Sequence, residues 1–231
     1  MSNTLAIFKK ELRSYFSSPI AYCIIIAFLL VSTWLFFWLG GFFLENQAHM
    51  RAFFVLMPWM FLFIAPATTM RLWAEEKKMG TVEILMTLPV RSYEVILGKY
   101  LASFVLFAVM ICLTFPVPAL VFYLGDPDGG QIFASYIGVF LMGAAYIAIG
   151  LCASTLTENQ IIAFILGIVM SLVFFLVGFA DMQLLSYLGL GTHFMSIARG
   201  VIDSRDLIYY FSMTGFFLYL SVLFVEVRSW R

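Results

Sequence analysis

The charged residues that could take part in chemistry gather in one stretch of the chain, Arg71 to Lys99. Eight charged side chains fall between positions 71 and 94. Two adjacent carboxylates, Glu75 and Glu76, can form ion pairs with basic groups of another protein. The stretch is much longer than a usual connection of about 4–6 residues. We therefore interpret it as a structured contact surface, with a plain charged loop as the alternative.

The residues after the acidic pair predict a short helix between two turns. Gly80 can end the preceding helix in the left-handed conformation, and Thr81 can cap the next helix, with Glu83 in its first turn. Pro89 ends that helix. An apolar stripe on such a helix can bind a groove on a partner. The residues assigned to this contact surface are Glu75, Glu76, Gly80, Thr81, Val82, Glu83, Leu85, Met86, Leu88 and Pro89.

Metal-binding and catalytic patterns are weak in this sequence. His49 and His193 are the only histidines, and neither has Cys, Asp or Glu at the spacing of a metal site. Ser171 has no nucleophile motif around it. The three cysteines lie inside apolar runs, which is typical of small buried side chains. We expect no catalytic residue, no metal ligand and no cofactor.

The composition places these residues in a membrane protein. Of the 231 residues, 63% are apolar or aromatic and 11% are charged. Soluble domains have about half and about a quarter, respectively, so a soluble enzyme is excluded. The 13 basic and 13 acidic residues cancel. Because the chain has no net positive charge to attract nucleic acid, nucleic acid is not an expected partner.

Charge-free runs predict an all-helical fold with six transmembrane helices, because a helix needs about 20 apolar residues to cross a bilayer. A seventh run, 182–198, is shorter and contains His193 among other polar residues and glycines, so we expect it not to cross. The predicted spans are 20–44, 52–70, 100–124, 131–154, 160–180 and 207–226.

The distribution of basic residues predicts the orientation. With six spans, ten Lys and Arg lie on the side of the two termini and three lie on the other side. Cytoplasmic segments carry this excess. Both termini and the stretch 71–99 are therefore expected on the cytoplasmic side of the membrane. The spans are expected to contact membrane lipids.

Two further segments flank the spans. Residues 1–19 are amphipathic, with Leu5, Phe8, Leu12 and Phe16 at helical spacing. We interpret them as an anchor on the membrane surface, with an elbow helix that transmits motion as the alternative. Residues 181–206 form an outer helical loop. It is either a helix in the membrane interface or a short re-entrant pair that lines a substrate path.

The sequence of the contact surface resembles that of a known protein family. The run Glu75-Glu76-Lys77, followed by Gly80 to Leu85, Leu88-Pro89-Val90, Glu94 and Gly98-Lys99, is similar to the cytoplasmic loop of ABC type 2 transporter permeases. The order of six spans around this loop also fits. The runs 156–164 and 193–210 resemble the gliding-motility and copper-processing branch of these bacterial permeases.

The resemblance implies a function for the whole chain as one permease domain, 1–231. It implies export across the bacterial inner membrane, driven by two copies of an ABC ATPase subunit that bind the coupling helix at Gly80–Leu88. The permease would work as a homodimer or with a second permease. The resemblance also allows a periplasmic auxiliary subunit as a further partner. Small residues at Gly138, Ala144, Ala148 and Gly150 are compatible with helix pairing in a dimer. The candidates for an outer gate are His193, Phe194 and Arg199.

ATP hydrolysis itself is expected on a partner chain. A P-loop needs GxxxxGK followed by Ser or Thr, whereas the Gly98-Lys99 pair is followed by Tyr100. Two other functions stay open at this point. One is a membrane scaffold that uses an ATPase to act on a periplasmic partner without transport. The other is an ATP-independent channel or carrier, although the spans lack the central ionisable residue of ion-coupled carriers.

Six spans with cytoplasmic termini predict a labelling pattern. Single substitutions Ser2→Cys, Asp128→Cys and Ser229→Cys are treated with a membrane-impermeant thiol reagent on intact cells. We expect labelling at position 128 and protection at positions 2 and 229, because only position 128 faces outward. Labelling at either terminus, or protection at position 128, contradicts this topology.

Overall fold

The computed structural model describes residues 3–40, 42, 49–82, 90–179 and 186–229. Within these ranges the chain is helical and has no strand. Six helices or helix pairs are long and apolar enough to cross a membrane, as the sequence predicted. The elements are α1 (Asn3–Ser17), α2 (Pro19–Trp34), the π-helix η1 (Leu35–Leu39), α3 (Arg51–Thr69), α4 (Arg71–Lys78), α6 (Ser92–Cys112), α7 (Pro116–Leu124), α8 (Gly129–Leu156), α9 (Gln160–Leu176), η2 (Val177–Phe179), α11 (Leu190–Ile197) and α12 (Ser204–Ser229).

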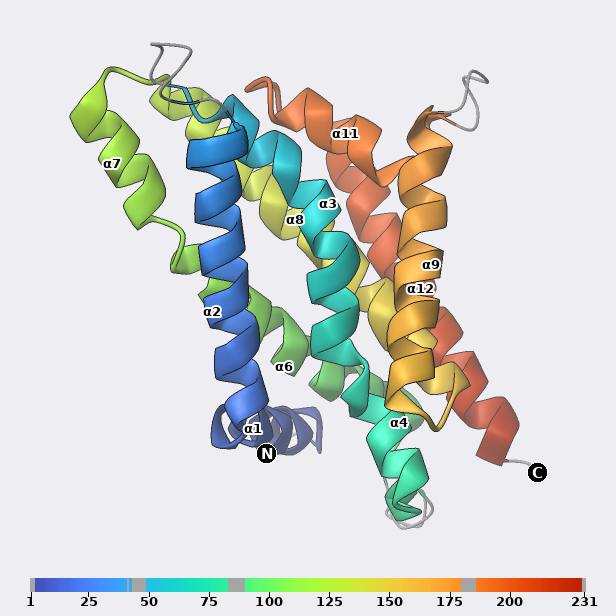
Figure 1. The fold of residues 1–231 in the computed structure, drawn as a ribbon. Helices are drawn as coiled ribbons and strands as arrows, with labels where there is room; N and C mark the ends of the chain where they lie inside the picture. Colours follow the sequence, from blue (N-terminus) through green and yellow to red (C-terminus); the bar gives the residue numbers. More distant parts are fainter. Residues whose placement is uncertain (1–2, 41, 43–48, 83–89, 180–185, 230–231) are drawn as a thin grey trace.

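Both termini lie at the same end of the helix bundle, which we call the termini end (Figure 1). Helix α1 runs across this end below α2, and α4 projects from it. Helix α11 lies at the opposite end, between α9 and α12. Helix α8 forms the centre of the bundle, since 72% of its membrane window is buried, against 22% for α9.

The amphipathic segment forms α1 and turns sharply into α2. Ser18 caps α2 by accepting a hydrogen bond from the amide of Ile20, and Pro19 occupies the first turn, where it costs no hydrogen bond. The buried residues of α1 are Glu11 and Tyr15, which do not belong to the predicted apolar stripe. The carboxylate of Glu11 can be buried because it pairs with the ammonium of Lys99 at 3.1 Å.

The third span differs most from its prediction. It begins at Ser92, eight residues before the predicted start, and it breaks between α6 and α7 at Leu113–Phe115. Pro116 has no amide hydrogen to continue the helix. The hydroxyl of Thr114 donates to the carbonyl of Ile111 at 2.6 Å and so satisfies a backbone group at the break.

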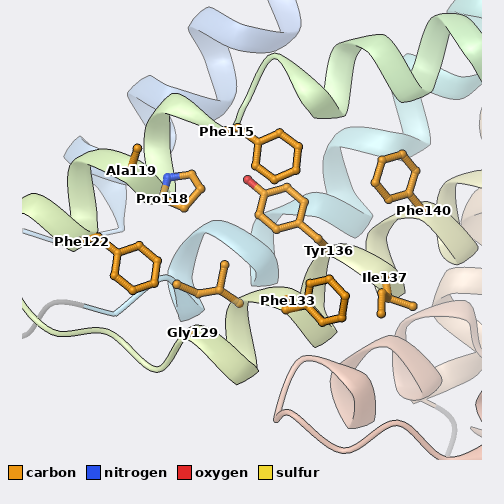
Figure 2. A pocket seen from close by; sticks show the side chains of 10 residues that line it. Phe115, Pro118, Ala119, Phe122, Gly129, Phe133, Tyr136, Ile137 and Phe140 are labelled. Carbon is orange, nitrogen blue, oxygen red and sulfur yellow. The ribbon is translucent and has the colours of Figure 1, made fainter.

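The break leaves an apolar pocket of about 410 Å³ between α7 and α8 (Figure 2). Phe115 and Tyr136 stack with ring centroids 4.9 Å apart at one side of it. The hydroxyl of Tyr136 is bonded to Thr114 at 3.0 Å. The pocket is lined by Phe115, Pro118, Ala119, Phe122, Gly129, Ile132, Phe133, Tyr136, Ile137 and Phe140.

Small residues of α8 allow close packing inside the chain. A Cβ at Gly150 would lie 2.4 Å from Oγ1 of Thr69, and one at Gly138 would lie 3.0 Å from the side chain of Ile197. Ala148 is fully buried. Helices α3 and α11 of the same chain therefore cover Gly150 and Gly138, whereas Ala144 is only partly buried. Pairing of these small residues with a second permease stays a prediction.

The contact at Gly150 predicts a stability effect. Gly150→Val places a branched side chain against Thr69 and against the backbone of Pro66, 3.3 Å from the added Cβ. We expect a loss of about 1–3 kcal/mol, the usual cost of overpacking. Gly215→Val is the matched control, since nothing lies within 4 Å of an added Cβ there. Thermal unfolding of both variants in detergent measures the difference. Equal midpoints would contradict close packing of α3 on α8.

Candidate functional site

Helix α4 is a continuation of α3 that leaves the bundle at the termini end. The end of α8 fixes its first turn, because Oγ of Ser154 accepts hydrogen bonds from the amides of Trp73 and Ala74 at 3.1 and 3.3 Å. The same hydroxyl donates to the carbonyl of Met70 at 2.9 Å. Lys77 donates to the carbonyl of Thr155 one turn further along. These bonds hold both turns of α4 on α8.

The turn after α4 has the conformation that the sequence predicted. Gly80 has φ of +69°, in the left-handed region, and its amide donates to the carbonyl of Lys77. The hydroxyl of Thr81 donates back to the carbonyl of Glu76 at 3.1 Å. Val82 is partly buried against the core. The predicted contact residues Glu83, Leu85, Met86, Leu88 and Pro89 lie outside the described residues.

A buried lysine joins α6 to α4 and α1. The ammonium of Lys99 donates to Glu11 Oε1 at 3.1 Å and to the carbonyl of Leu72 at 2.7 Å. It also lies 2.8 Å from Glu76 Oε2 as an ion pair. The ring of Trp73 lies under it, 5.2 Å away. Lys99 is only 1% exposed, so its charge is met by two hydrogen bonds and an ion pair with protein groups rather than by water.

A second lysine closes this ion cluster, which consists of Lys10, Glu11, Glu76 and Lys99. Lys10 Nζ lies 3.1 Å from Glu76 Oε1 and 3.6 Å from Glu11 Oε1, so the four charges balance. Burial lowers the pKa of Lys10, but attraction to Glu76 and Glu11 outweighs it, and the pKa is raised overall. Glu76 therefore uses its carboxylate within the chain, whereas we expected it to face a partner.

Two more contacts fix α1 against the neighbouring helices. The hydroxyl of Tyr15 donates to the carbonyl of Thr68 at 2.5 Å and lies 3.0 Å from Oγ of Ser103. Burial raises the pKa of Tyr15 to about 12, so the hydroxyl keeps its proton at any physiological pH. Gly98 lets α1 approach α6, since an added Cβ would lie 2.9 Å from the side chain of Ile7.

The arrangement makes α1, the start of α6 and α4 one mechanical unit. A buried charge that loses its partner costs about 3–5 kcal/mol, so these helices resist separation. The unit continues into α2 through Pro19 and into α3 through Met70. Among the described residues, α1 and α4 are thus linked to each other and each leads directly into a membrane helix.

The opposite end contains the residues that we proposed for a gate. His193 and Phe194 of α11 are buried, and Arg199 is exposed. His193 Nδ1 lies 2.6 Å from Asp206 Oδ1, and its Nε2 lies 2.8 Å from the carbonyl of Tyr187. The ring stacks on Tyr209 with centroids 4.0 Å apart. The structure thus brings His193 and Phe194 into the contacts of α11 and leaves Arg199 outside them.

Sequence reasoning missed the ion cluster. Lys99 is one signal for it, because this lysine directly precedes a charge-free run in a span. Its partner Glu11 is 88 positions away, and no local pattern connects the two. The pairing of Asp206 with His193 was also missed. Among the described residues, no group of three His, Cys, Asp or Glu could hold a metal ion.

Comparison with models of protein families gives a match. A family model described as ABC-2 family transporter protein matches residues 42–202. This range contains α3, α4, the turn at Gly80, Lys99 and α11. No curated protein matches the chain.

The ion cluster predicts a large loss of stability when its central charge is removed. Lys99→Met leaves Glu11 and Glu76 with only Lys10, and we expect a loss of about 3–5 kcal/mol. Adding Glu76→Gln should restore part of it, because one uncompensated carboxylate is removed. Lys78→Met is the control, since Lys78 is exposed on α4, the helix that carries Glu76. Thermal unfolding in detergent measures all four proteins. A Lys99→Met protein as stable as the control would show that the cluster holds nothing together.

Proposed function

The chain belongs to the ABC-2 family of transporter proteins, and from this we propose that it is the membrane subunit of an ATP-binding-cassette exporter. It couples ATP hydrolysis by a separate ATPase subunit to movement of a substrate through or out of the membrane. The family match over most of the chain is the observation that carries this proposal. Six helices long and apolar enough to span a membrane agree with it.

The termini end is the proposed docking surface for the ATPase. Helix α4 leads into the segment Gly80–Leu88, which we propose as the coupling helix. Glu75 is partly exposed beside it and is available for an ion pair with the partner. Glu76 has a different proposed role. Its ion pairs with Lys99 and Lys10 link the coupling segment to α6 and α1 rather than to the ATPase.

The same cluster suggests how motion is transmitted. Closure of two ATPase subunits around ATP would displace the coupling helix, and α4 would carry the displacement to α1 through Glu76 and Glu11. Because α1 continues into α2 at Pro19, the first span would move together with α3. Helix α1 would then be an elbow that transmits motion, and not only a membrane anchor.

The remaining features of the assembly follow from the same proposal. The termini end faces the cytoplasm, in agreement with its excess of Lys and Arg. Two permeases, identical or different, stand over two ATPase subunits in the bacterial inner membrane, since each permease offers one coupling helix. The resemblance of runs 156–164 and 193–210 favours the gliding-motility and copper-processing branch, in which a periplasmic auxiliary subunit has a place.

Purification of the chain from its native membranes tests the proposal as a whole. We expect a P-loop ATPase to be recovered with the permease, and its hydrolysis of ATP to depend on the permease. Solute flux into vesicles that contain this complex distinguishes an exporter from a scaffold. Recovery of the chain without any ATPase would contradict both and would favour a channel or carrier.

The coupling helix makes a specific prediction. Leu85→Asp puts a charge into the proposed apolar contact, and Gly80→Val opposes the left-handed backbone observed at Gly80. We expect both variants to lose co-purification of the ATPase by about tenfold or more, the effect of one buried unpaired charge or strained turn. Neither residue lies in a span, so abundance in the membrane should stay normal.

Lys9→Asp is the matched control for this experiment. It introduces the same acidic group at the termini end, on the exposed side of α1. ATPase recovery and permease-dependent hydrolysis should remain at the wild-type level. If Leu85→Asp behaves like this control at normal abundance, Gly80–Leu88 is not the coupling helix.

A further inference from the structure

Both ring nitrogens of His193 face oxygen atoms at the end opposite the termini. Nε2 lies 2.8 Å from the carbonyl oxygen of Tyr187, which can only accept a hydrogen bond. Nδ1 lies 2.6 Å from Oδ1 of Asp206. His193 and Asp206 are each 5% exposed, so water does not replace either contact.

These contacts fix the number of protons on the pair. Nε2 must carry a proton, because a bare nitrogen would repel the carbonyl oxygen. A second proton must lie between Nδ1 and Oδ1, since two lone pairs at 2.6 Å would also repel. The pair is therefore an imidazolium with a carboxylate or an imidazole with a carboxylic acid. Both forms contain the same protons and have no net charge.

Loss of the shared proton would break one of the two contacts. A neutral ring can donate to Asp206 or to Tyr187, but not to both. The pair would then also have a net negative charge in a buried place, which is costly. Oδ2 of Asp206 has no hydrogen-bond partner among the described residues, so it does not help to hold that charge.

The neighbouring bonds do not respond to pH in the same range. The hydroxyls of Tyr209 and Tyr210 donate to the carbonyls of Leu188 and Leu190 at 2.6 and 2.7 Å. Tyrosine titrates near 10, far above histidine. The His193–Asp206 contact is therefore the pH-sensitive one of the bonds that hold this loop on α12.

Other ionisable groups lie on most of the elements that pack around the pair, but not on α9. The edge of the Tyr187 ring meets His193, with centroids 4.8 Å apart. Residues 160–179, which include α9, have no ionisable side chain. The ionisable side chains of the described part of the loop and of the first two turns of α12 are Tyr187, Arg199, Asp203, Arg205, Tyr209 and Tyr210. Those of α8 and its cap are Asp128, Tyr136, Tyr146 and Cys152, and Arg51 begins α3. Arg51, Arg199, Asp203 and Arg205 are exposed.

The geometry points to a proton-binding site formed by His193 and Asp206. While the proton is present, the site locks α11 onto the start of α12. When the proton is lost, the neutral ring keeps only one of its two contacts, to Asp206 or to Tyr187, and α11 loosens. The site couples the pH of the compartment that it faces to the position of α11.

The site deepens the proposed function and rests on it for one point only. If the termini lie in the cytoplasm, the site faces the outer compartment, and the loop is the proposed gate. The lock itself does not depend on this orientation. Setting the same pH on both sides of the membrane therefore tests the lock independently of transport.

Hydrogen exchange of the full chain in lipid vesicles tests the proposal. Protection of the α11 amides is measured from about pH 5 to about pH 9, which spans the ordinary titration of histidine. Exchange in α8 of the same molecules corrects for the chemical rate. In the wild type we expect protection of α11 to fall about tenfold or more as pH rises, the effect of losing one charge-assisted hydrogen bond.

Asp206→Asn is the decisive variant. Its amide N–H can donate to Nδ1 of a neutral ring, so no shared proton is needed, and protection of α11 should be independent of pH. Asp203→Asn is the matched control, because Asp203 is an exposed acid that caps the same helix at the amide of Arg205. It should keep the wild-type pH dependence.

Two results would overturn the proposal. One is protection of α11 in the wild type that does not change with pH. The other is an Asp206→Asn protein whose pH dependence equals that of the wild type. Fast hydrogen exchange in α8 of Asp206→Asn would show that this variant does not fold. In that case the pH dependence of the wild type and of Asp203→Asn decides the proposal. A fall in protection confined to α11 and the start of α12 in both supports the lock.

Discussion

An ammonium group buried at the edge of a membrane must be neutralised by protein, and this constraint organises the termini end of the fold. Lys99 lies at the start of the third span with almost no access to water. Its acceptors come from α1 and from α4, so both helices must stand where they do. The placement of α1 across the bundle, the burial of Glu11 and the fixed direction of α4 follow from this one requirement.

The sequence predicted the features that depend on local composition. Helices long and apolar enough to span a membrane appear at the six longer charge-free runs, because each charge in lipid is costly. The left-handed backbone conformation at Gly80 was also predicted from local sequence, because the residue that follows a helix in this conformation is most often glycine. The break at Leu113–Phe115 was not predicted as a break. Prolines are tolerated inside α3 at Pro58 and Pro66, so Pro116 alone does not show whether a span bends or ends.

The candidate site could be predicted only where its residues are neighbours in the chain. The contact surface at Glu75–Pro89 is continuous in sequence, so a local pattern was enough to propose it, and it stays a prediction. The partners Glu11 and Lys99, or Ser154 and Trp73, meet only after several helices have packed. Glu76 illustrates the difference. Its position beside a coupling segment is local information, whereas its pairing with Lys99 depends on the tertiary fold.

The ion cluster also has a consequence for the order in which the chain is made. Glu11 and Glu76 both precede Lys99, so a ribosome produces the two carboxylates before the ammonium that they neutralise. When the third span enters the membrane, its lysine finds both counter-charges already present. In the proposed proton-binding site the order is reversed, because the basic residue His193 is made before the acidic residue Asp206. During biogenesis, the termini end can thus assemble as each helix arrives, while the opposite end is completed only with the last span.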